Sequence, residues 1–338
     1  MNAALLTNAK AALLTNAKAT PFRYAFAAMT TSCELEFYGL TPAAALVLAQ
    51  AIEARVAGLV KRFNFHASDS WLNRTVNNRR TNRIQVDTET AEILACVREH
   101  SLQTQGAFDI TAGTLALRLR RARSASDVAE IHRQLTPYRG VERWWLEAQI
   151  LCFDNHVTRF DLGGVIKEYA VDVSASMARA AGVQAGLINY GGDLYAIGVK
   201  PLFTKNRLDV DTAPQRFVAA IVNPLAPEKM LFGLDLEDQA LTTSAHYARN
   251  RLLKAKPNEP AQRLSHIVGA AESSRWISAT VVSGSTLLSG IYSTALLLKD
   301  DLTLPAGVTA VVVDATGQVH SMTGFNMTDS TINTEKQP

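Results

Sequence analysis

The sequence predicts an α+β protein, a single domain with mixed or antiparallel sheets and flanking helices in two intertwined lobes. Three observations predict this class: apolar residues recur at helical spacing over 41–63, several segments after Val141 have the composition of strands, and no linker divides 21–326. Of 338 residues, 47% are hydrophobic. Such a chain can bury a core, which argues against disorder as its main state.

The first part of the chain predicts one strand and two helices. Residues 22–39 alternate apolar and polar side chains, as a half-buried strand does. A helix then begins with Thr41 as its N-cap and Pro42 in its first turn, and a second helix runs from Thr88 to about His100. Between them, the polar stretch 64–83 predicts a loop with four solvated arginines: Arg74, Arg79, Arg80 and Arg83.

The second part of the chain predicts mostly strands. Residues 141–162 predict a hairpin that turns at Asp154-Asn155, and 170–182 predict a helix ended by its glycine. Residues 186–198 predict two short strands around a Gly-Gly-Asp turn. The remaining elements are strands at 217–222, 277–283 and 308–314 and a buried helix at 286–298 that Thr286 caps.

Both ends of the chain predict tails. Residues 1–20 contain the octapeptide AALLTNAK twice in tandem, at 3–10 and 11–18, which is typical of a frayed and weakly helical segment. Residues 327–338 are polar and predict a second tail. The domain itself is therefore expected to span 21–326.

Charge, hydropathy and cysteine content bear on partners and location. The net charge of +3 is too small to predict a nucleic-acid partner. No stretch of about 20 apolar residues is free of charged or polar clusters, so no membrane span is expected. Lysines 10 and 18 interrupt the apolar runs that a signal peptide needs. The three cysteines, Cys33, Cys96 and Cys152, lie far apart, which favours a reducing, cytoplasmic location with Cys33 as a small buried residue.

Candidate chemistry is concentrated where predicted strands end. The glycine fingerprints of the common nucleotide-binding folds are absent. Glycine, aspartate, histidine and threonine gather instead in four segments, with His-Ile-Val at 266–268 behind them. These segments are QGAFDIT (105–111), FDLGGVIKEYAVD (160–172), YGGDL (190–194) and TTSAHY (242–247).

Each side chain in these segments has an ordinary structural interpretation beside the functional one. Asp109 and Asp161 suit turns or helix caps as well as a ligand's hydrogen-bond donors. Lys167 is either a surface lysine or, just after Gly163-Gly164 at a helix start, a partner for phosphate. His266 is either structural or catalytic.

The order of these motifs resembles that of the ApbE family of flavin transferases. The series comprises Met29, Asp69-Ser70 with Asn73, GAFDIT, D-L-G-G-x-x-K, N-x-G-G-D-L, Thr243-Ser244, His-Ile-Val and a final Ser-Thr-Ala helix. The resemblance runs from about Phe26 to Phe325. It implies an α+β fold and the activity of an FAD:protein FMN transferase, which moves FMN from FAD to a threonine hydroxyl of a target protein and releases AMP with the help of Mg²⁺.

The resemblance also implies site residues. The flavin and adenine contacts would be Met29, His66, Ala107, Phe108, Asp109, Asp161, Lys167 and Val268. His266 would be catalytic. The backbone carbonyl of Gly164 and the hydroxyl of Thr294 would bind the metal ion.

The chain departs from the family pattern at four positions. Gly290 stands where the last helix usually carries an aspartate four residues before Thr294, and Gly269 replaces a second aspartate. Lys167 is followed by Glu168 and not by glycine, and Ala245 follows Thr243-Ser244. Glu168 is a candidate to replace part of the missing charge. Two alternatives to the transferase follow: an FAD-binding pseudoenzyme or flavin carrier, and a structural subunit without flavin.

Overall fold

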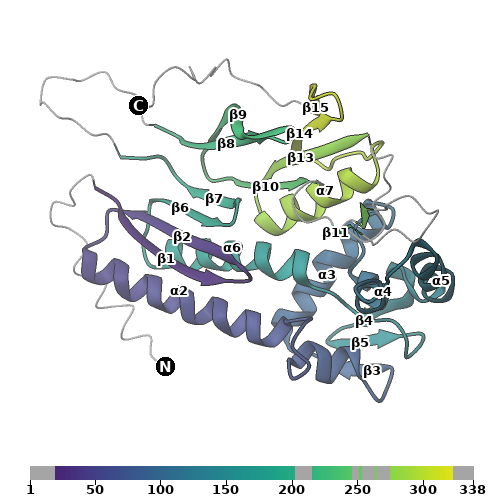
Figure 1. Ribbon diagram of the computed structural model, residues 1–338. Coiled ribbons are helices and arrows are strands. Elements are labelled where there is room, and N and C mark those ends of the chain that lie inside the picture. Colours follow the sequence, from purple (N-terminus) through teal and green to yellow (C-terminus); the bar gives the residue numbers. More distant parts are fainter. Residues whose placement is uncertain (1–19, 202–214, 246–250, 253–262, 265–274, 323–338) are drawn as a thin grey trace, which may run out of the picture.

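An eight-stranded antiparallel sheet forms the centre of the molecule (Figure 1). The structure is a computed structural model that describes residues 20–201, 215–245, 251–252, 263–264 and 275–322. In sheet order the strands are β1 (Phe22–Ala28), β2 (Thr31–Tyr38), β6 (Ala185–Tyr190), β7 (Asp193–Ile197), β10 (Ala240–Ala245), β13 (Trp276–Ser283), β14 (Thr309–Asp314) and β15 (Val319–Met322). The predicted α+β class is confirmed, and the strand predictions around Gly191-Gly192 and over 277–283 and 308–314 hold.

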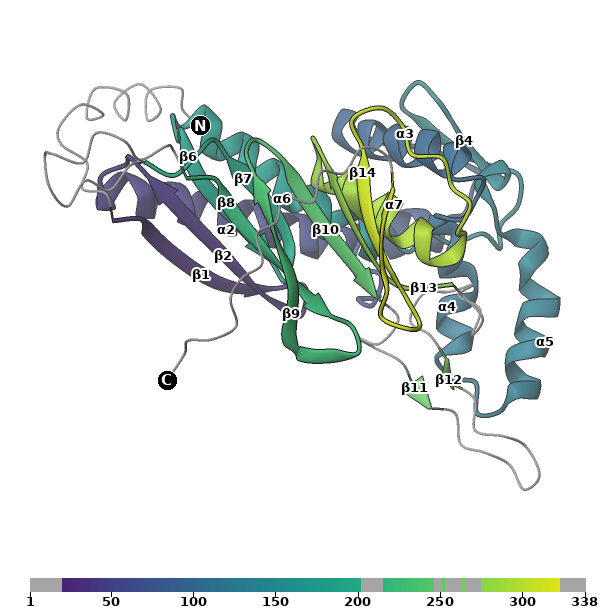
Figure 2. The same cartoon turned by 90° about the horizontal axis from the view of Figure 1, so that it is seen from above.

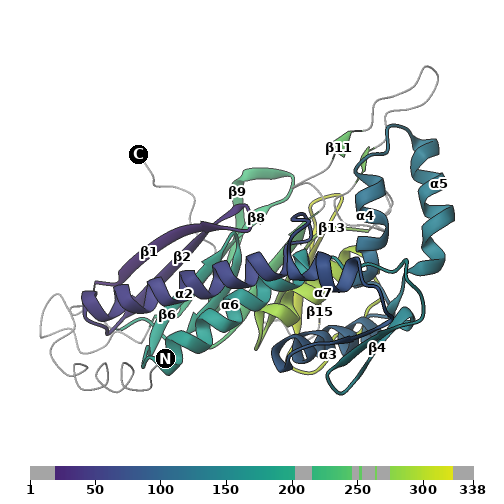
Figure 3. The same cartoon turned by 90° about the horizontal axis from the view of Figure 1, so that it is seen from below.

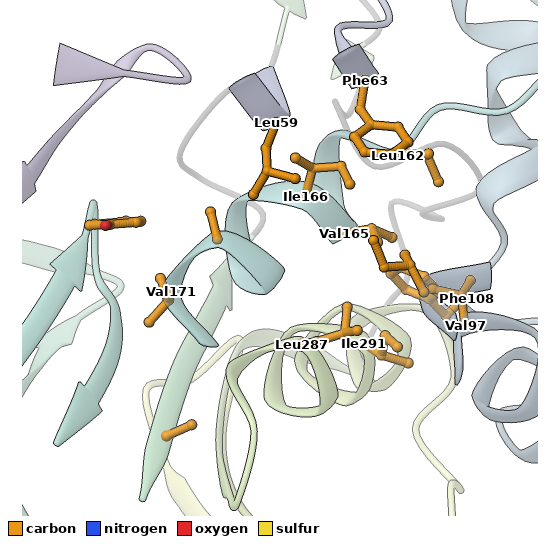
Figure 4. Packing of buried hydrophobic residues seen from close by; sticks show 14 of the residues in the cluster. Leu59, Phe63, Val97, Phe108, Leu162, Val165, Ile166, Val171, Leu287 and Ile291 are labelled. Atoms are coloured by element: carbon orange, nitrogen blue, oxygen red, sulfur yellow. The ribbon is translucent and has the colours of Figure 1, made fainter. Parts of the chain in front are cut away.

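Three helices cover one face of this sheet. They are α2 (Pro42–Phe63), α6 (Gly163–Ala180) and α7 (Thr286–Leu298), and α2 lies beside α6 in the view from below (Figure 3). Their apolar stripes meet in the largest buried cluster of the molecule. Figure 4 shows part of it, with Leu59 and Phe63 from α2, Val165 and Ile166 from α6, and Leu287 and Ile291 from α7.

A two-stranded sheet covers the opposite face. Strands β8 (Phe217–Asn223) and β9 (Ala226–Leu236) form a hairpin, which Figure 2 shows in front of the central strands. Phe217, Ile221 and Leu234 of the hairpin are buried against Tyr38 and Val282 of the central sheet. The central strands are therefore buried between helices and a hairpin.

The stretch of chain between α2 and α6 forms a smaller group of elements at one end of the sheet (Figure 1). Strands β3, β5 and β4 make a three-stranded sheet in that order, and β11 pairs with β12 elsewhere. The bounds are η1 (Leu72–Asn77), β3 (Arg83–Gln85), α3 (Thr88–Gln103), η2 (Ile110–Ala112), α4 (Gly113–Leu119), α5 (Ala125–Leu135), η3 (Thr136–Tyr138), η4 (Val141–Arg143), β4 (Trp144–Glu147), β5 (Ile150–Phe153), β11 (Arg251–Leu252) and β12 (Arg263–Leu264).

Two turns differ from the sequence prediction. In both, residues other than glycine adopt a positive φ, which a sequence pattern does not indicate. The predicted single strand 22–39 is a hairpin, and its turn residues Met29 and Thr30 have φ of 52° and 62°. The hairpin after Val141 turns at Ala148, with φ of 53°, and not at Asp154-Asn155. Neither turn has the Asn-Gly or Asp-Gly sequence that usually marks one.

The predicted polar loop at 64–83 contains buried structure. Its Leu72–Asn77 segment is a π-helix, and Arg79 is 9% exposed. The Arg79 guanidinium donates to the carbonyls of Val76, Thr158 and Asn155 and lies over the ring of Phe153. Burial lowers the pKa of Arg79 to about 10. The prediction of a solvated arginine is therefore wrong at this position.

Helix boundaries agree with the prediction except at two N-termini. Thr41 caps α2, and α3 begins at Thr88 behind the side chain of Asp87. Helix α6 starts at Gly163, seven residues before the predicted start at Ala170. The cap of α7 is Ser285, whose hydroxyl accepts from the N–H of Leu288, and not Thr286.

By length and composition alone, α2 could cross a membrane, unlike the other helices of the described residues. This corrects the expectation that no stretch would meet that test. Its apolar side chains form one stripe, which includes Ile52, Val56 and Leu59, and this stripe packs into the core. Glu53 lies among them in sequence and accepts a hydrogen bond from Tyr24 of β1. Packing of this stripe accounts for part of the hydropathy of α2, since Leu46 and Val47 of the same helix are exposed.

All three cysteines are free thiols, and Cys33 is fully buried in β2 as predicted. The tails predicted at 1–20 and 327–338 lie outside the described residues apart from Thr20, so the domain limits stay predictions.

The carboxylate of Asp172 joins α6 to the start of α7. It accepts hydrogen bonds from the N–H groups of Thr286 (2.6 Å) and Leu287 (2.9 Å) and from the hydroxyl of Ser285 (2.8 Å). An anion at a helix N-terminus satisfies amides that have no partner within the helix and interacts favourably with the helix dipole. Burial raises the pKa of Asp172, and these hydrogen bonds oppose that rise.

We expect Asp172→Ala to lower the free energy of unfolding by about 2 to 4 kcal/mol, because buried amides and a hydroxyl lose their acceptor. Asp172→Asn keeps one acceptor oxygen and should cost less. Urea denaturation of both variants measures the difference. Equal stability of the alanine variant and the wild type would contradict the role of Asp172 as the acceptor for the first amides of α7.

Candidate functional site

Two turns of the central sheet lie side by side and form one wall of the candidate site. The β1–β2 turn contains Met29, and the β6–β7 turn contains Gly191 and Gly192, with φ of 63° and 96°. Strands β2 and β6 pair antiparallel with Cys33 opposite Tyr190, which brings both turns to one edge. A side chain at Gly191 would collide with that of Thr31, so this contact requires glycine.

Two cavities open beside this edge. The larger, of about 690 Å³, is lined by residues 25–32, which include Phe26 and Met29. A second cavity of about 260 Å³ lies between the end of β1 and α2 and shares Phe26 with the first. Met29 therefore lines open space, as a residue that contacts a ligand must.

The segment that precedes α6 is held by the segment 110–114. The N–H of Asp161 donates to the carbonyl of Ile110 at 2.8 Å. A Cβ on Gly113 would lie 2.7 Å from the amide nitrogen of Asp161 and 2.7 Å from the carbonyl carbon of Phe160. Gly113 thus permits a close approach of two backbones, and the GAFDIT and DLGG motifs become neighbours.

Two buried asparagines of the π-helix support the same segment. The side chain of Asn77 donates to the carbonyl of Phe160 (2.9 Å) and accepts from its N–H (2.8 Å). It also donates to the side-chain oxygen Oδ1 of Asn73, and the Asn73 side-chain amide in turn donates to the backbone carbonyls of Phe65 and Ala67. Sequence reasoning missed Asn77, although its spacing of four residues from Asn73 was a usable signal.

Asp109 and Asp161 differ in how they are held. Asp109 accepts from the N–H of Thr111 at 2.8 Å and pairs with Arg139, and its side chain is 7% exposed. Asp161 accepts from the N–H of Gly163 at 2.9 Å and has no ion pair within the described residues. Burial raises the pKa of Asp161, and the nearby His66 and Arg120 oppose that rise. Asp109 is thus part of the framework, whereas Asp161 has acceptor capacity left.

The remaining predicted ligand contacts on this side differ in how exposed they are. His66 is exposed, and its Nδ1 lies 2.8 Å from the Arg120 guanidinium. The ring of Phe108 is 6% exposed and lies in the core beside Val97 and Val165 (Figure 4). The ring of Phe108, which was expected to contact the flavin or the adenine, is therefore mostly buried in the core. Ala107 is half-buried next to it.

Lys167 and Glu168 bring opposite charges to the first turns of α6. The Lys167 ammonium forms an ion pair with Asp193 of β7, whose side chain is 3% exposed. It also lies 3.9 Å from Oε1 of Glu168, whose side chain is 7% exposed. Burial, and then repulsion from Asp193, raises the pKa of Glu168. Sequence reasoning placed Asp193 in the candidate segment YGGDL but did not identify it as the partner of Lys167.

Three hydroxyl groups lie close together where α7 contacts β10. Thr294 Oγ1 lies 3.2 Å from Ser244 Oγ of β10, which lies 2.9 Å from Ser293 Oγ. Gly164 departs from helical geometry, with φ of −91° and ψ of 18°, and has no atom near the position of its missing side chain. His266 and Val268 lie outside the described residues, so their predicted roles stay predictions.

The oxygen donors here suit a hard divalent cation. Glu168 Oε2 is buried and has no hydrogen-bond partner among the described residues, and the Glu168 side chain lies against Gly290 of α7, four residues before Thr294. The described part of the chain contains no group of three or more histidine, cysteine, aspartate or glutamate side chains that could hold a metal ion alone. A cation would therefore need further oxygen ligands from a bound molecule.

Comparisons with known proteins agree on one family. A model of the ApbE family matches residues 29–317. A relative from Vibrio cholerae serotype O1, named FAD:protein FMN transferase, is 25% identical over 247 residues, which are 70% of this chain and 68% of the relative. A protein of the same name from Klebsiella pneumoniae is 23% identical over 73% of this chain and 75% of its own length.

Solved structures share the fold. The ApbE protein of Thermotoga maritima matches with a TM-score of 0.74 and 20% identity over 89% of this chain and 97% of its own. The apo flavinyl transferase ApbE of Pseudomonas stutzeri matches with a TM-score of 0.70 and 22% identity, over 92% of this chain and 97% of its own.

The two aspartates should respond differently to loss of charge. We expect Asp109→Asn to lower the free energy of unfolding by about 1 to 3 kcal/mol, because Arg139 loses a charged acceptor in a largely buried pair. Asp161→Asn keeps the acceptor for Gly163 and should leave stability nearly unchanged. Thermal and urea unfolding compare the two. Equal losses in both variants would show that Asp161 is as much a framework residue as Asp109.

Proposed function

Because the chain belongs to the ApbE family, we propose that it is an FAD:protein FMN transferase. One observation carries the proposal: motifs that are far apart in the sequence contact one another in the fold. The β1–β2 turn lies beside the β6–β7 turn, the start of α6 forms an ion pair with β7, and β10 contacts α7 through hydroxyl groups. An open cavity of about 690 Å³, lined by residues 25–32, lies at the β1–β2 turn. In the reaction, the pyrophosphate bond of FAD breaks, the FMN phosphorus binds a threonine oxygen of an acceptor protein, AMP leaves, and the hydroxyl proton is lost.

Lys167 and Asp161 are the residues of this chain best placed for the phosphates and the nucleotide. Phosphoryl transfer depends mainly on positioning and on neutralisation of charge. Lys167 supplies a cation at the N-terminal turns of α6, where the helix dipole also favours an anion. Asp161 supplies an acceptor for a ribose or adenine donor, and Met29 supplies an apolar surface for a ring system.

Mg²⁺ belongs to the same proposal. The Gly164 carbonyl and the Thr294 hydroxyl would hold it, and the buried Glu168 carboxylate, whose side chain lies against Gly290 of the same helix as Thr294, supports that assignment. When bound, the ion would neutralise charge on the pyrophosphate and act as a Lewis acid. A cytoplasmic location stays a prediction from the sequence, and the acceptor protein is not identified.

A second candidate is a flavin-binding protein without transferase activity. The observation that favours it is Gly290, which brings no carboxylate to α7. Such a protein would bind FAD without breaking its pyrophosphate bond.

The transfer reaction distinguishes the two candidates. We expect incubation with FAD, Mg²⁺ and a soluble protein extract to give AMP together with flavin fluorescence that stays on an acceptor band after denaturation. AMP is measured by chromatography, and the modified threonine by mass spectrometry. FAD that raises the melting temperature while no AMP appears would identify the flavin carrier. No effect of FAD on stability would rule out both.

Lys167 should be tested together with its partner. Removing Lys167 alone leaves Asp193 buried and unpaired, which by itself destabilises a protein by about 3 to 5 kcal/mol. We therefore expect Lys167→Met with Asp193→Asn to stay folded but to bind FAD about ten- to a hundredfold more weakly. Asp193→Asn alone keeps the cation and is the matched control. Fluorescence titration in EDTA measures the affinity, and equal affinity of the two variants would contradict a phosphate contact by Lys167.

A further inference from the structure

An unpartnered carboxylate oxygen is buried between α6 and α7. Glu168 is 5% exposed, and its Oε2 has no hydrogen-bond partner among the described residues. The nearest cation, Lys167, lies 3.9 Å from the other oxygen and pairs with Asp193. Buried carboxylate oxygens are normally paired with donors or cations, because an unpaired one loses its hydration without compensation. Glu168 therefore has one long ion pair, shared with Asp193, at Oε1 and no partner among the described residues at Oε2.

The Glu168 side chain fills the space beside Gly290. A Cβ on Gly290 would lie 2.6 Å from Glu168 Cγ and 3.2 Å from Cδ. Real Cβ atoms do not approach so closely, so a side chain at position 290 requires the Glu168 side chain to move out of this packing. The carboxyl group of Glu168 consequently lies against the turn of α7 that begins at Gly290.

That turn of α7 presents further oxygen donors. Thr294 follows Gly290 by four residues and lies on the same helix face, and its hydroxyl is 3.2 Å from Ser244 Oγ. With both carboxyl groups ionised, Glu168, Asp193 and Lys167 together carry a net charge of −1. A negative charge beside hydroxyl oxygens is the environment that Mg²⁺ and similar hard cations prefer.

We propose that Glu168 is the charged protein ligand of a divalent-cation site between α6 and α7, with the Thr294 hydroxyl as a neutral ligand. The carboxylate thus comes from α6 and not from α7. This inference rests on the proposed function, because phosphate oxygens of bound FAD would complete the coordination. It also replaces the simple expectation that an aspartate at position 290 would restore metal binding, since that side chain would collide with Glu168.

The first experiment measures Mn²⁺ binding by the full chain, with and without FAD, through the electron paramagnetic resonance signal of free Mn²⁺. We expect Glu168→Gln to weaken binding about tenfold or more, while FAD affinity in EDTA and the melting temperature of the apo protein are kept. Glu130→Gln, at an exposed ion pair on α5, is the matched control. Mn²⁺ affinity of Glu168→Gln equal to that of the wild type would overturn the proposal.

The second experiment moves the carboxylate. Gly290→Asp alone should lower the melting temperature by about 3 °C or more, because the core is overpacked. Combined with Glu168→Ala, the same substitution should fit and recover the Mn²⁺ affinity that Glu168→Ala loses. A folded double variant that binds Mn²⁺ no better than Glu168→Ala would overturn the site.

The two proposals fail in different ways. If the wild-type chain does not bind FAD, the proposed function is wrong. The cation site is then tested separately, by comparing Mn²⁺ binding of the wild type and Glu168→Gln without FAD. FAD binding without any effect of Glu168→Gln on Mn²⁺ overturns the cation site and leaves the function in place.

Discussion

The bond between Asp172 and the first amides of α7 fixes how the two central helices lie against each other. Asp172 holds the α7 end at Thr286 and Leu287. One helical turn earlier on α6 is Glu168, and one turn further into α7 is Gly290, so the two helices meet again at that level. The register set by one carboxylate therefore determines which residues face each other at the candidate site. Lys167, next in sequence to Glu168, reaches β7 on the sheet.

The other half of the site depends on backbone contacts and not on charged side chains. The segment before α6 is clamped between Asn77, which satisfies both backbone groups of Phe160, and Gly113, which allows the closest approach. Its position decides where α6 begins and where the Asp161 carboxylate lies. The backbone of this segment is thus held by hydrogen bonds and close packing. The open cavity lies at another turn of the molecule, between β1 and β2. Such preorganisation suits a reaction that relies on positioning.

Periodicity and caps predicted most helices and strands, because these signals are local. Thr41 and the apolar stripe after it identified α2, and Gly182, with φ of 90°, ended α6 as expected. The errors came from tertiary contacts that no local pattern encodes. Arg79 is polar in sequence but buried because three carbonyls accept from it, and Met29 adopts positive φ because the hairpin requires it. For the site, motif order indicated the segments, whereas the partners Asp193, Arg139 and Asn77 emerged only from the fold.

The shared volume of Glu168 and Gly290 has a consequence for how substitutions combine. A side chain at position 290 needs the space that Glu168 fills, so the effect of a substitution at 290 depends on the residue at 168. A stability scan of single substitutions would record position 290 as intolerant, although an aspartate there fits once Glu168 is reduced to alanine. A sequence alignment treats positions 168 and 290 as independent. It would therefore record a side chain lost at 290 and one gained at 168, although in three dimensions both side chains would fill the same space between α6 and α7.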